Sequence, residues 1–156
     1  MSISTYLETA PLFEIVKYSD KYREQLLDVW EKSVLETHDF LSASDFLEIK
    51  EIVTKIDFNA FNVYCLLDRD NVIGFLGTAN QKLEMLFLSP EHIGKGLGKK
   101  LLNFAIRELK ANKVDVNEQN TNAVKFYSKF GFKTYERTAK DEQGKNYPLL
   151  RMELNK

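Results

Sequence analysis

The 156-residue chain is long enough for one compact domain that buries roughly two-thirds of the surface of its unfolded form. Hydrophobic residues make up 44% of the chain and the formal net charge is only −1, so the composition gives no reason to expect a nucleic acid or an anionic membrane as a partner. Cys65 is the only cysteine, which excludes an internal disulfide and a cysteine-based zinc site, and we expect no metal cofactor.

The chain has no apolar run typical of a targeting or membrane-spanning segment. Near the N-terminus, Glu8, Pro11 and Glu14 interrupt the apolar residues. Nowhere do about 18 apolar residues follow one another. There is also no repeat, low-complexity tract or linker-like stretch. We therefore expect a single domain over residues 1–156 in the cytoplasm, as a monomer or a homodimer.

The first third of the chain predicts one strand and two helices. Residues 12–17 alternate enough for a short strand, and Asp20 can cap a helix over residues 21–35. The apolar residues of this helix recur with the 3.6-residue period: Leu26, Leu27, Trp30 and Val34. Ser42 or Ser44 can then cap a second helix. Its apolar stripe follows the same period: Phe46, Ile49, Val53 and Ile56.

The middle of the chain predicts three short strands joined by tight turns. Residues 62–68, 72–79 and 82–88 are strand-like, and residues 69–71 can form the tip of a hairpin. This spacing indicates an antiparallel meander, which Pro90 closes.

The last third predicts two helices and three strands. The first helix, which starts near Gly98, has one apolar face: Leu97, Leu101, Leu102, Ala105 and Leu109. A short strand over residues 113–116 precedes a second helix that stops at Gly131. The apolar face of that helix is Ala123, Phe126, Tyr127 and Phe130. With strands over 132–136 and 147–154, the order is βααβββαβαββ, which predicts an α/β domain with a mixed sheet.

Three of the seven glycines, Gly94, Gly96 and Gly98, lie between the third meander strand and the following helix. Such a turn can point backbone N–H groups into one concavity, and a helix N-terminus adds about half a positive charge. Its natural ligand is a phosphate or a pyrophosphate, although the glycines could also serve only a tight connection. Nearby cations are Lys95, Lys99 and Lys100.

Two familiar phosphate-binding loops do not match this turn. The P-loop ends in Gly-Lys-Ser/Thr, but here Lys99 is followed by Lys100, which offers no hydroxyl to a magnesium ion. The dinucleotide-binding fingerprint would need a glycine at position 99, and its preceding strand should not belong to an antiparallel meander. We therefore do not expect a nucleotide-binding loop of either kind.

Three segments in this order resemble the GNAT superfamily of N-acetyltransferases: residues 83–90, 94–99 and 120–132. The resemblance spans roughly residues 12–154 and implies a mostly antiparallel mixed sheet flanked by helices. Shorter segments are similar to the bacterial YjaB-type branch: residues 37–42, 116–120 and 147–150. One departure is Ile93, because the superfamily usually has Gln or Arg at the head of the glycine turn.

The resemblance implies acetyl-coenzyme A as the acyl donor. Its pyrophosphate would lie on the turn formed by Ile93, Gly94, Lys95, Gly96, Leu97, Gly98 and Lys99. Strand 85–88 should splay from strand 113–116 and expose Leu86, Phe87 and Leu88 to the pantetheine, with an N–H near Leu86 as oxyanion donor. The remaining implied contacts are Asn117, Asn120, Ala123 and Tyr127.

Acetyl transfer to an amine requires a base for the ammonium group and an acid for the departing thiolate. An amine with a pKa of about 10.4 is neutral only about once in 10³ molecules at pH 7. Tyr127, which the resemblance implies stands beside the sulfur, is the expected acid, and Glu84 is the candidate base, directly or through water. Each has a simpler interpretation: Tyr127 as a core aromatic and Glu84 as a solvated carboxylate.

The acceptor pocket is expected around His38 and Phe40, between the first two helices. His38 would orient the substrate or relay a proton, or else simply bond to backbone within its loop. We therefore expect direct attack by a primary amine, on a small molecule or a protein lysine or N-terminus, in a ternary complex. The alternative is an acyl-coenzyme A-binding sensor that performs no transfer.

Overall fold

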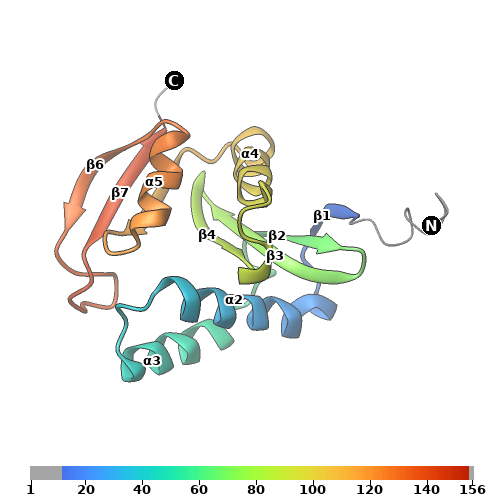
Figure 1. The fold of residues 1–156 in the computed structure, drawn as a ribbon, viewed down its shortest axis with the longest axis horizontal. Coiled ribbons are helices and arrows are strands. Elements are labelled where there is room, and N and C mark those ends of the chain that lie inside the picture. The colour runs from blue at the N-terminus through green and yellow to red at the C-terminus, as the bar shows by residue number, and fades with distance from the viewer. Residues whose placement is uncertain (1–11, 155–156) are drawn as a thin grey trace.

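The computed structural model describes residues 12–154, which form one seven-stranded sheet with helices on both faces (Figure 1). The strands are β1 (Phe13–Lys17), β2 (Asn62–Asp68), β3 (Asn71–Ala79), β4 (Lys82–Leu88), β5 (Lys113–Asn117), β6 (Phe132–Thr138) and β7 (Leu149–Leu154). The helices are α2 (Arg23–Thr37), α3 (Ala43–Thr54), α4 (Leu97–Leu109) and α5 (Thr121–Lys129), with short 3₁₀ helices η1 (Asp20–Tyr22) and η2 (Pro90–His92). The predicted order of strands and α-helices is confirmed.

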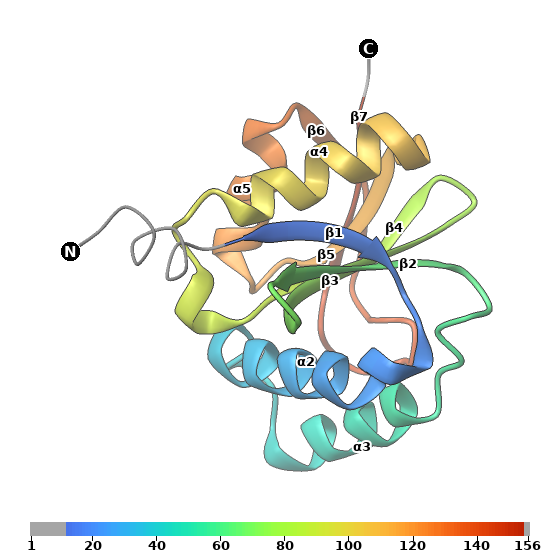
Figure 2. The ribbon, with the colours of Figure 1, turned by 90° about the vertical axis from the view of Figure 1, so that its right-hand side faces the viewer.

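The sheet separates two hydrophobic cores (Figure 2). On one face, α4 and α5 cover a core that includes Leu101, Leu102 and Tyr127. On the other face, α2 and α3 cover a core around Leu26 and Phe75. Helix α3 contributes a single buried residue, Val53, whereas α2 contributes five, so α3 packs less deeply against the sheet than α2.

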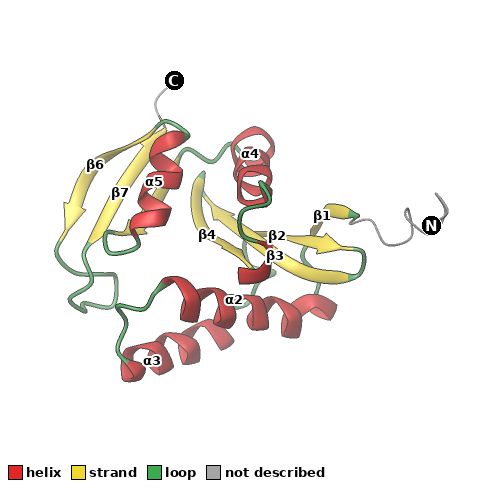
Figure 3. Cartoon of the chain, in the orientation of Figure 1, coloured by secondary structure: helices red, strands yellow, loops and turns green. Residues whose placement is uncertain are grey.

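The sheet is antiparallel except at one joint. Strands pair in the order β1-β2-β3-β4-β5-β7-β6. The parallel pair β4–β5 is joined only at Lys82↔Lys113 and Leu83↔Val114, and beyond Leu83 the two strands diverge. Figure 3 shows the result: β6 and β7 stand apart from β4. The expected mixed, mostly antiparallel sheet and the splay of its two middle strands are both confirmed.

Two local predictions were wrong in detail. Asp20 does not cap α2: it begins η1, and its carboxylate accepts hydrogen bonds from the Tyr18 hydroxyl and the Asn59 amide, both at 3.0 Å. Ile56 lies beyond the end of α3. Of the two candidate caps for α3, Ser42 is used, and its hydroxyl accepts the Asp45 N–H at 3.1 Å.

Within residues 12–154, no helix is long and apolar enough to cross a membrane.

Candidate active site

The glycine turn joins η2 to α4 and has the backbone conformation that glycine favours. Gly94 and Gly96 have φ of 87° and 77°, in the left-handed region. A Cβ at either position would meet nothing within 4 Å, so the requirement for glycine comes from the backbone conformation and not from crowding. Gly96 is the N-cap of α4, and buried Leu97 anchors the first turn.

This turn presents donors suited to an anion. The Lys100 N–H donates to the Gly96 carbonyl at 3.2 Å, which closes the first helical turn. The N–H groups before it are the unpaired donors of a helix N-terminus, where the helix dipole also favours negative charge. Lys95 and Lys99 are exposed beside them, and so is Ile93, whose side chain is 54% exposed. The predicted pyrophosphate residues are therefore together on one accessible turn.

Beyond Leu83, the opening between β4 and β5 forms a hollow of about 220 Å³, which we call the donor cleft. Most predicted pantetheine contacts line it: Leu86, Phe87, Asn117, Asn120, Ala123 and Tyr127. Leu88 ends β4 and is half-buried against the core beneath α4. Asn120 also has a structural task that the sequence did not reveal, because its Oδ1 caps α5 by accepting the Ala123 N–H at 3.2 Å.

Tyr127 is fixed in the wall of the donor cleft by its neighbours. Its side chain is only 7% exposed, and its ring packs edge-on against Phe126 and Phe132. Burial raises the pKa of the Tyr127 phenol above its ordinary value, which keeps the phenol protonated near neutral pH. A tyrosine held in this state can donate a proton.

A second hollow of about 280 Å³, which we call the acceptor cavity, lies where α2, α3, the divergent strands and the β6–β7 loop meet. Trp30 and Val34 of α2 and Ile49 of α3 give it an apolar wall. Polar residues supply much of the remaining lining: His38, Lys82, Glu84, Asp115, Asn117, Asp141, Glu142, Gln143 and Tyr147. The cavity therefore combines apolar walls with acidic and other polar groups.

Four carboxylates and one lysine line this cavity. Lys82 pairs with Asp115 at 2.7 Å and lies 3.7 Å from Glu142, which leaves Glu84 and Asp141 as further acids. Burial raises the pKa of Glu84 above its ordinary value, and nearby Lys82 partly opposes this. A carboxylate with a raised pKa is a better proton acceptor than an ordinary solvated one.

His38 lines both hollows and presents a defined nitrogen. The Thr37 hydroxyl donates its one proton to the Ser33 carbonyl at 2.8 Å, so it can only accept from His38 Nδ1, also at 2.8 Å. Burial lowers the pKa of His38 and favours the neutral ring, which leaves Nε2 as the unprotonated nitrogen. The ring thus bonds to a side chain and not, as one interpretation had it, to backbone.

Phe40 does not line the acceptor cavity but packs behind two residues that do, His38 and Tyr147. Its ring centroid is 5.2 Å from that of His38 and 6.0 Å from that of Tyr147. Tyr147 and Asp115 are residues of the site that the sequence did not single out. Both owe their position to partners far along the chain: Tyr147 meets α3, and Asp115 also binds Arg151 at 3.2 Å.

The two hollows meet. Both are lined by the same residues at their junction: His38, Leu83, Glu84, Phe87, Asp115 and Asn117. A group carried along the divergent strands would therefore arrive beside the acceptor cavity. A sheet opened between two parallel strands, a glycine turn into a helix and a buried tyrosine at the opening define an acyl-coenzyme A-dependent acetyltransferase.

Comparisons with known proteins agree with this class. A family model described as an acetyltransferase (GNAT) domain matches residues 20–156. The chain is 39% identical over 129 residues to the peptidyl-lysine N-acetyltransferase YjaB of Salmonella typhimurium, covering 83% of this chain and 89% of that protein. Its fold is similar to the solution structure of apo-form YjaB from Escherichia coli, with a TM-score of 0.83 and 34% identity over 91% of this chain and 97% of that one.

The fold is also similar to that of the PaiA N-acetyltransferase from Thermoplasma acidophilum, solved in complex with coenzyme A. That comparison has a TM-score of 0.67 and 23% identity, and it covers 91% of this chain and 99% of the other. The chain therefore belongs to the GNAT superfamily and, within it, to the YjaB-type branch. It is a GNAT-type N-acetyltransferase.

Proposed function

We propose that this enzyme transfers an acetyl group from acetyl-coenzyme A to the side-chain amine of a lysine in a protein. The observation that carries the proposal is the junction of the donor cleft and the acceptor cavity, which share Glu84 and Phe87 in their walls. The acidic, partly apolar acceptor cavity suits the aliphatic stem and positive end of lysine. The peptidyl-lysine activity named for the YjaB relative supports the same acceptor.

The chemistry follows from the residues at this junction. Glu84, directly or through water, removes a proton from the ammonium group, with His38 Nε2 as the second candidate acceptor or relay. The free amine attacks the thioester carbon in a ternary complex and forms the new C–N bond. An N–H near Leu86 stabilises the oxyanion. The C–S bond then breaks, and Tyr127 gives its phenolic proton to the departing thiolate. The nitrogen of the new amide loses its second proton, which returns to Tyr127 through water, and Glu84 releases the first proton to solvent.

The donor is bound mainly through main-chain groups in this proposal. The glycine turn from Gly94 to Lys99 holds the pyrophosphate, while Leu86, Leu88 and Asn117 contact the pantetheine. Exposed Ile93 need not weaken the site greatly, because its side chain is not required where N–H groups carry the binding. No observation favours the alternative of a non-catalytic sensor. An acidic cavity at the end of the donor cleft suits transfer of an acetyl group to an amine, and binding of acyl-coenzyme A alone does not require it.

Thiol release from acetyl-coenzyme A tests this function. Wild-type protein is assayed with a lysine-containing peptide, the same peptide with its lysines replaced by arginine, and a small polyamine. We expect release that depends on the lysine peptide, with the peptide gaining one acetyl group by mass spectrometry. Thiol release with the polyamine alone would show that the acceptor is a small amine and not a lysine in a protein. Tight coenzyme binding without release for any acceptor would favour the sensor.

A further inference from the structure

The loop between β6 and β7, residues 139–148, forms one side of the acceptor cavity. It supplies Asp141, Glu142, Gln143 and Tyr147 to the cavity wall. The opposite side comes from α2, α3 and their connection, roughly a hundred residues earlier in the chain. The shape of the cavity therefore depends on how this loop is held against α3.

The tip of the loop is ordered by its own hydrogen bonds. The Asp141 carboxylate accepts the N–H groups of Gln143 at 3.0 Å and Lys145 at 2.9 Å, and the Asp141 N–H donates to the Lys145 carbonyl at 3.0 Å. Gly144, with φ of 79°, allows the chain to reverse here. These bonds order the tip internally, whereas its position against α3 depends on external contacts.

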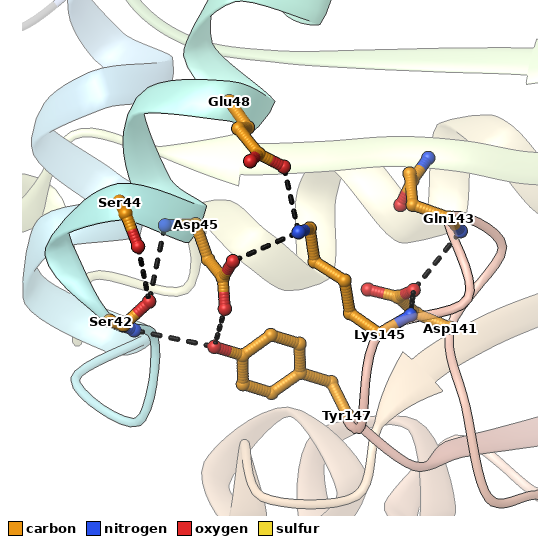
Figure 4. Close-up of polar contacts among 8 residues, drawn as sticks. All are labelled: Ser42, Ser44, Asp45, Glu48, Asp141, Gln143, Lys145 and Tyr147. Atoms are coloured by element: carbon orange, nitrogen blue, oxygen red, sulfur yellow. Dashed lines mark hydrogen bonds and ion pairs between the residues drawn. The ribbon is translucent and has the colours of Figure 1, made fainter.

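Those contacts converge on Asp45, in the first turn of α3 (Figure 4). The Tyr147 hydroxyl donates to one Asp45 oxygen and accepts the Ser42 N–H at 3.3 Å. The Lys145 ammonium lies 3.0 Å from the other Asp45 oxygen and 2.7 Å from a Glu48 oxygen. We call these five residues the loop clamp. It joins both oxygens of one carboxylate to the loop.

Asp45 is well suited to this position. A carboxylate in the first turn of a helix is stabilised by the helix dipole. Ser42 caps α3, so Asp45 is free to face the loop. The side chains of Asp45 and Lys145 are only 22% and 26% exposed, which shields their interaction from water. Hydrogen bonds from Tyr147 and Lys145 hold the pKa of Asp45 below its ordinary value, so it stays ionised.

We propose that Asp45 is a positioning residue of the acceptor site: through Tyr147 and Lys145 it holds the β6–β7 loop where it closes the acceptor cavity around the incoming lysine side chain. This inference rests on the proposed lysine acceptor. Breaking the clamp lets the wall move away and weakens acceptor binding. The donor cleft, built from β4, β5 and α5, keeps its geometry.

Steady-state kinetics of matched variants test the inference. Tyr147→Phe keeps the aromatic ring and removes the hydroxyl, and Asp45→Asn removes the charge. We expect each to raise KM for the lysine peptide about tenfold, because hydrogen bonds to a charged group are lost, while KM for acetyl-coenzyme A stays within about twofold. The controls are Glu51→Gln, an exposed carboxylate of the same helix, and Lys140→Met, an exposed lysine of the same loop. Neither control should change KM for the peptide.

Two further readouts separate positioning from mere stabilisation. Amide hydrogen exchange at residues 141–147, measured without substrate, should be faster in Tyr147→Phe than in Glu51→Gln. The double variant Asp45→Asn/Tyr147→Phe should weaken peptide binding by less than the sum of the two single effects, because both variants weaken the contact between Asp45 and Tyr147.

The possible failures are distinct. If wild type shows no lysine-dependent thiol release, the proposed acceptor is wrong and the inference falls with it. If wild type is active but the clamp variants lose only thermal stability and active fraction, with an unchanged KM for the peptide, the inference alone is overturned. Unchanged exchange in the loop would overturn it as well.

Discussion

The two halves of the active site are built in different ways. The donor half is mainly main chain: left-handed glycines before α4 and two strands that pair over only two residues and then diverge. The acceptor half is mainly side chains from distant segments, such as Tyr147 against Asp45 and Phe40. The difference predicts that donor recognition depends little on side-chain identity, whereas single substitutions can change acceptor recognition.

The largest expected effect lies where the halves meet, at Tyr127. Tyr127→Phe keeps the ring packed against Phe126 and Phe132 but removes the proton for the leaving thiolate. We expect kcat to fall about a hundredfold or more, with coenzyme A affinity within about threefold of wild type. Stopped-flow or steady-state thiol release measures the first quantity and calorimetry the second. Unchanged turnover with the true acceptor would remove Tyr127 from the acid role.

The next effect concerns the base on the acceptor side of the junction. Glu84 acts as a base when deprotonated, and its pKa is raised by burial, so kcat/KM should rise with pH through a limb above the ordinary glutamate value of 4.5. Glu84→Gln should remove that limb and lower kcat/KM about tenfold to a hundredfold near neutral pH.

The comparison variant is His38→Gln, which removes the other candidate proton acceptor. If the acid limb survives Glu84→Gln and disappears in His38→Gln, the base is His38. Because a raised carboxyl pKa makes ionised Glu84 unfavourable in the folded state, Glu84→Gln should not lower thermal stability at neutral pH.

Two glycines sharpen the contrast between the halves, since Gly96 on the donor turn and Gly144 on the acceptor loop have nearly equal φ, 77° and 79°. A Cβ at either meets nothing within 4 Å. Changing either to Ala should therefore cost a similar roughly 1–2 kcal/mol of stability through backbone strain alone. Gly96→Ala should weaken coenzyme A binding about tenfold, and Gly144→Ala should leave it unchanged.

Chemical denaturation and coenzyme A titration of this pair measure the two effects. If both variants lost the same coenzyme A affinity, backbone strain at any position would lower that affinity, and the effect could not be assigned to the donor turn. An unchanged affinity in Gly96→Ala would remove the turn from the pyrophosphate site.

The smallest effect is the pH dependence of the clamp. The folded-state pKa of Asp45 is lowered by Tyr147 and Lys145, so its stabilising contribution is fully present above the ordinary value of 3.8 and is lost as pH falls through the folded-state pKa. Asp45→Asn should therefore lower Tm at pH 7, and the difference from wild type should vanish in strong acid. A difference that persists once Asp45 is fully protonated in the folded state would assign it to packing instead.

The sequence predicted most of the donor half because its signals are local. The helix that begins at Leu97, the glycine turn and the strands 62–68 and 82–88 each follow from residues close together in the chain. The same holds for the order of strands and α-helices and hence for the sheet. Asp20 failed as a cap because tertiary partners, Tyr18 and Asn59, bind its carboxylate.

The acceptor half could be predicted only in outline. The sequence predicted that His38 lies in a pocket. Its tautomer, however, depends on the hydrogen bonds that link His38 to Thr37 and Thr37 to Ser33, and these form only at the end of the folded helix. The Tyr147–Asp45 contact joins residues 102 positions apart, and no pattern of spacing indicates such a pair. Side chains that meet across a fold carry no local signature.

An initial-velocity matrix of acetyl-coenzyme A against a lysine peptide tests the central claim, that a main-chain donor site and a side-chain acceptor site meet in one cleft. It is measured for wild type, Gly96→Ala and Tyr147→Phe. We predict intersecting lines for wild type, a raised KM for acetyl-coenzyme A only in Gly96→Ala, and a raised KM for the peptide only in Tyr147→Phe. Parallel lines, or both variants raising the same KM, would contradict it.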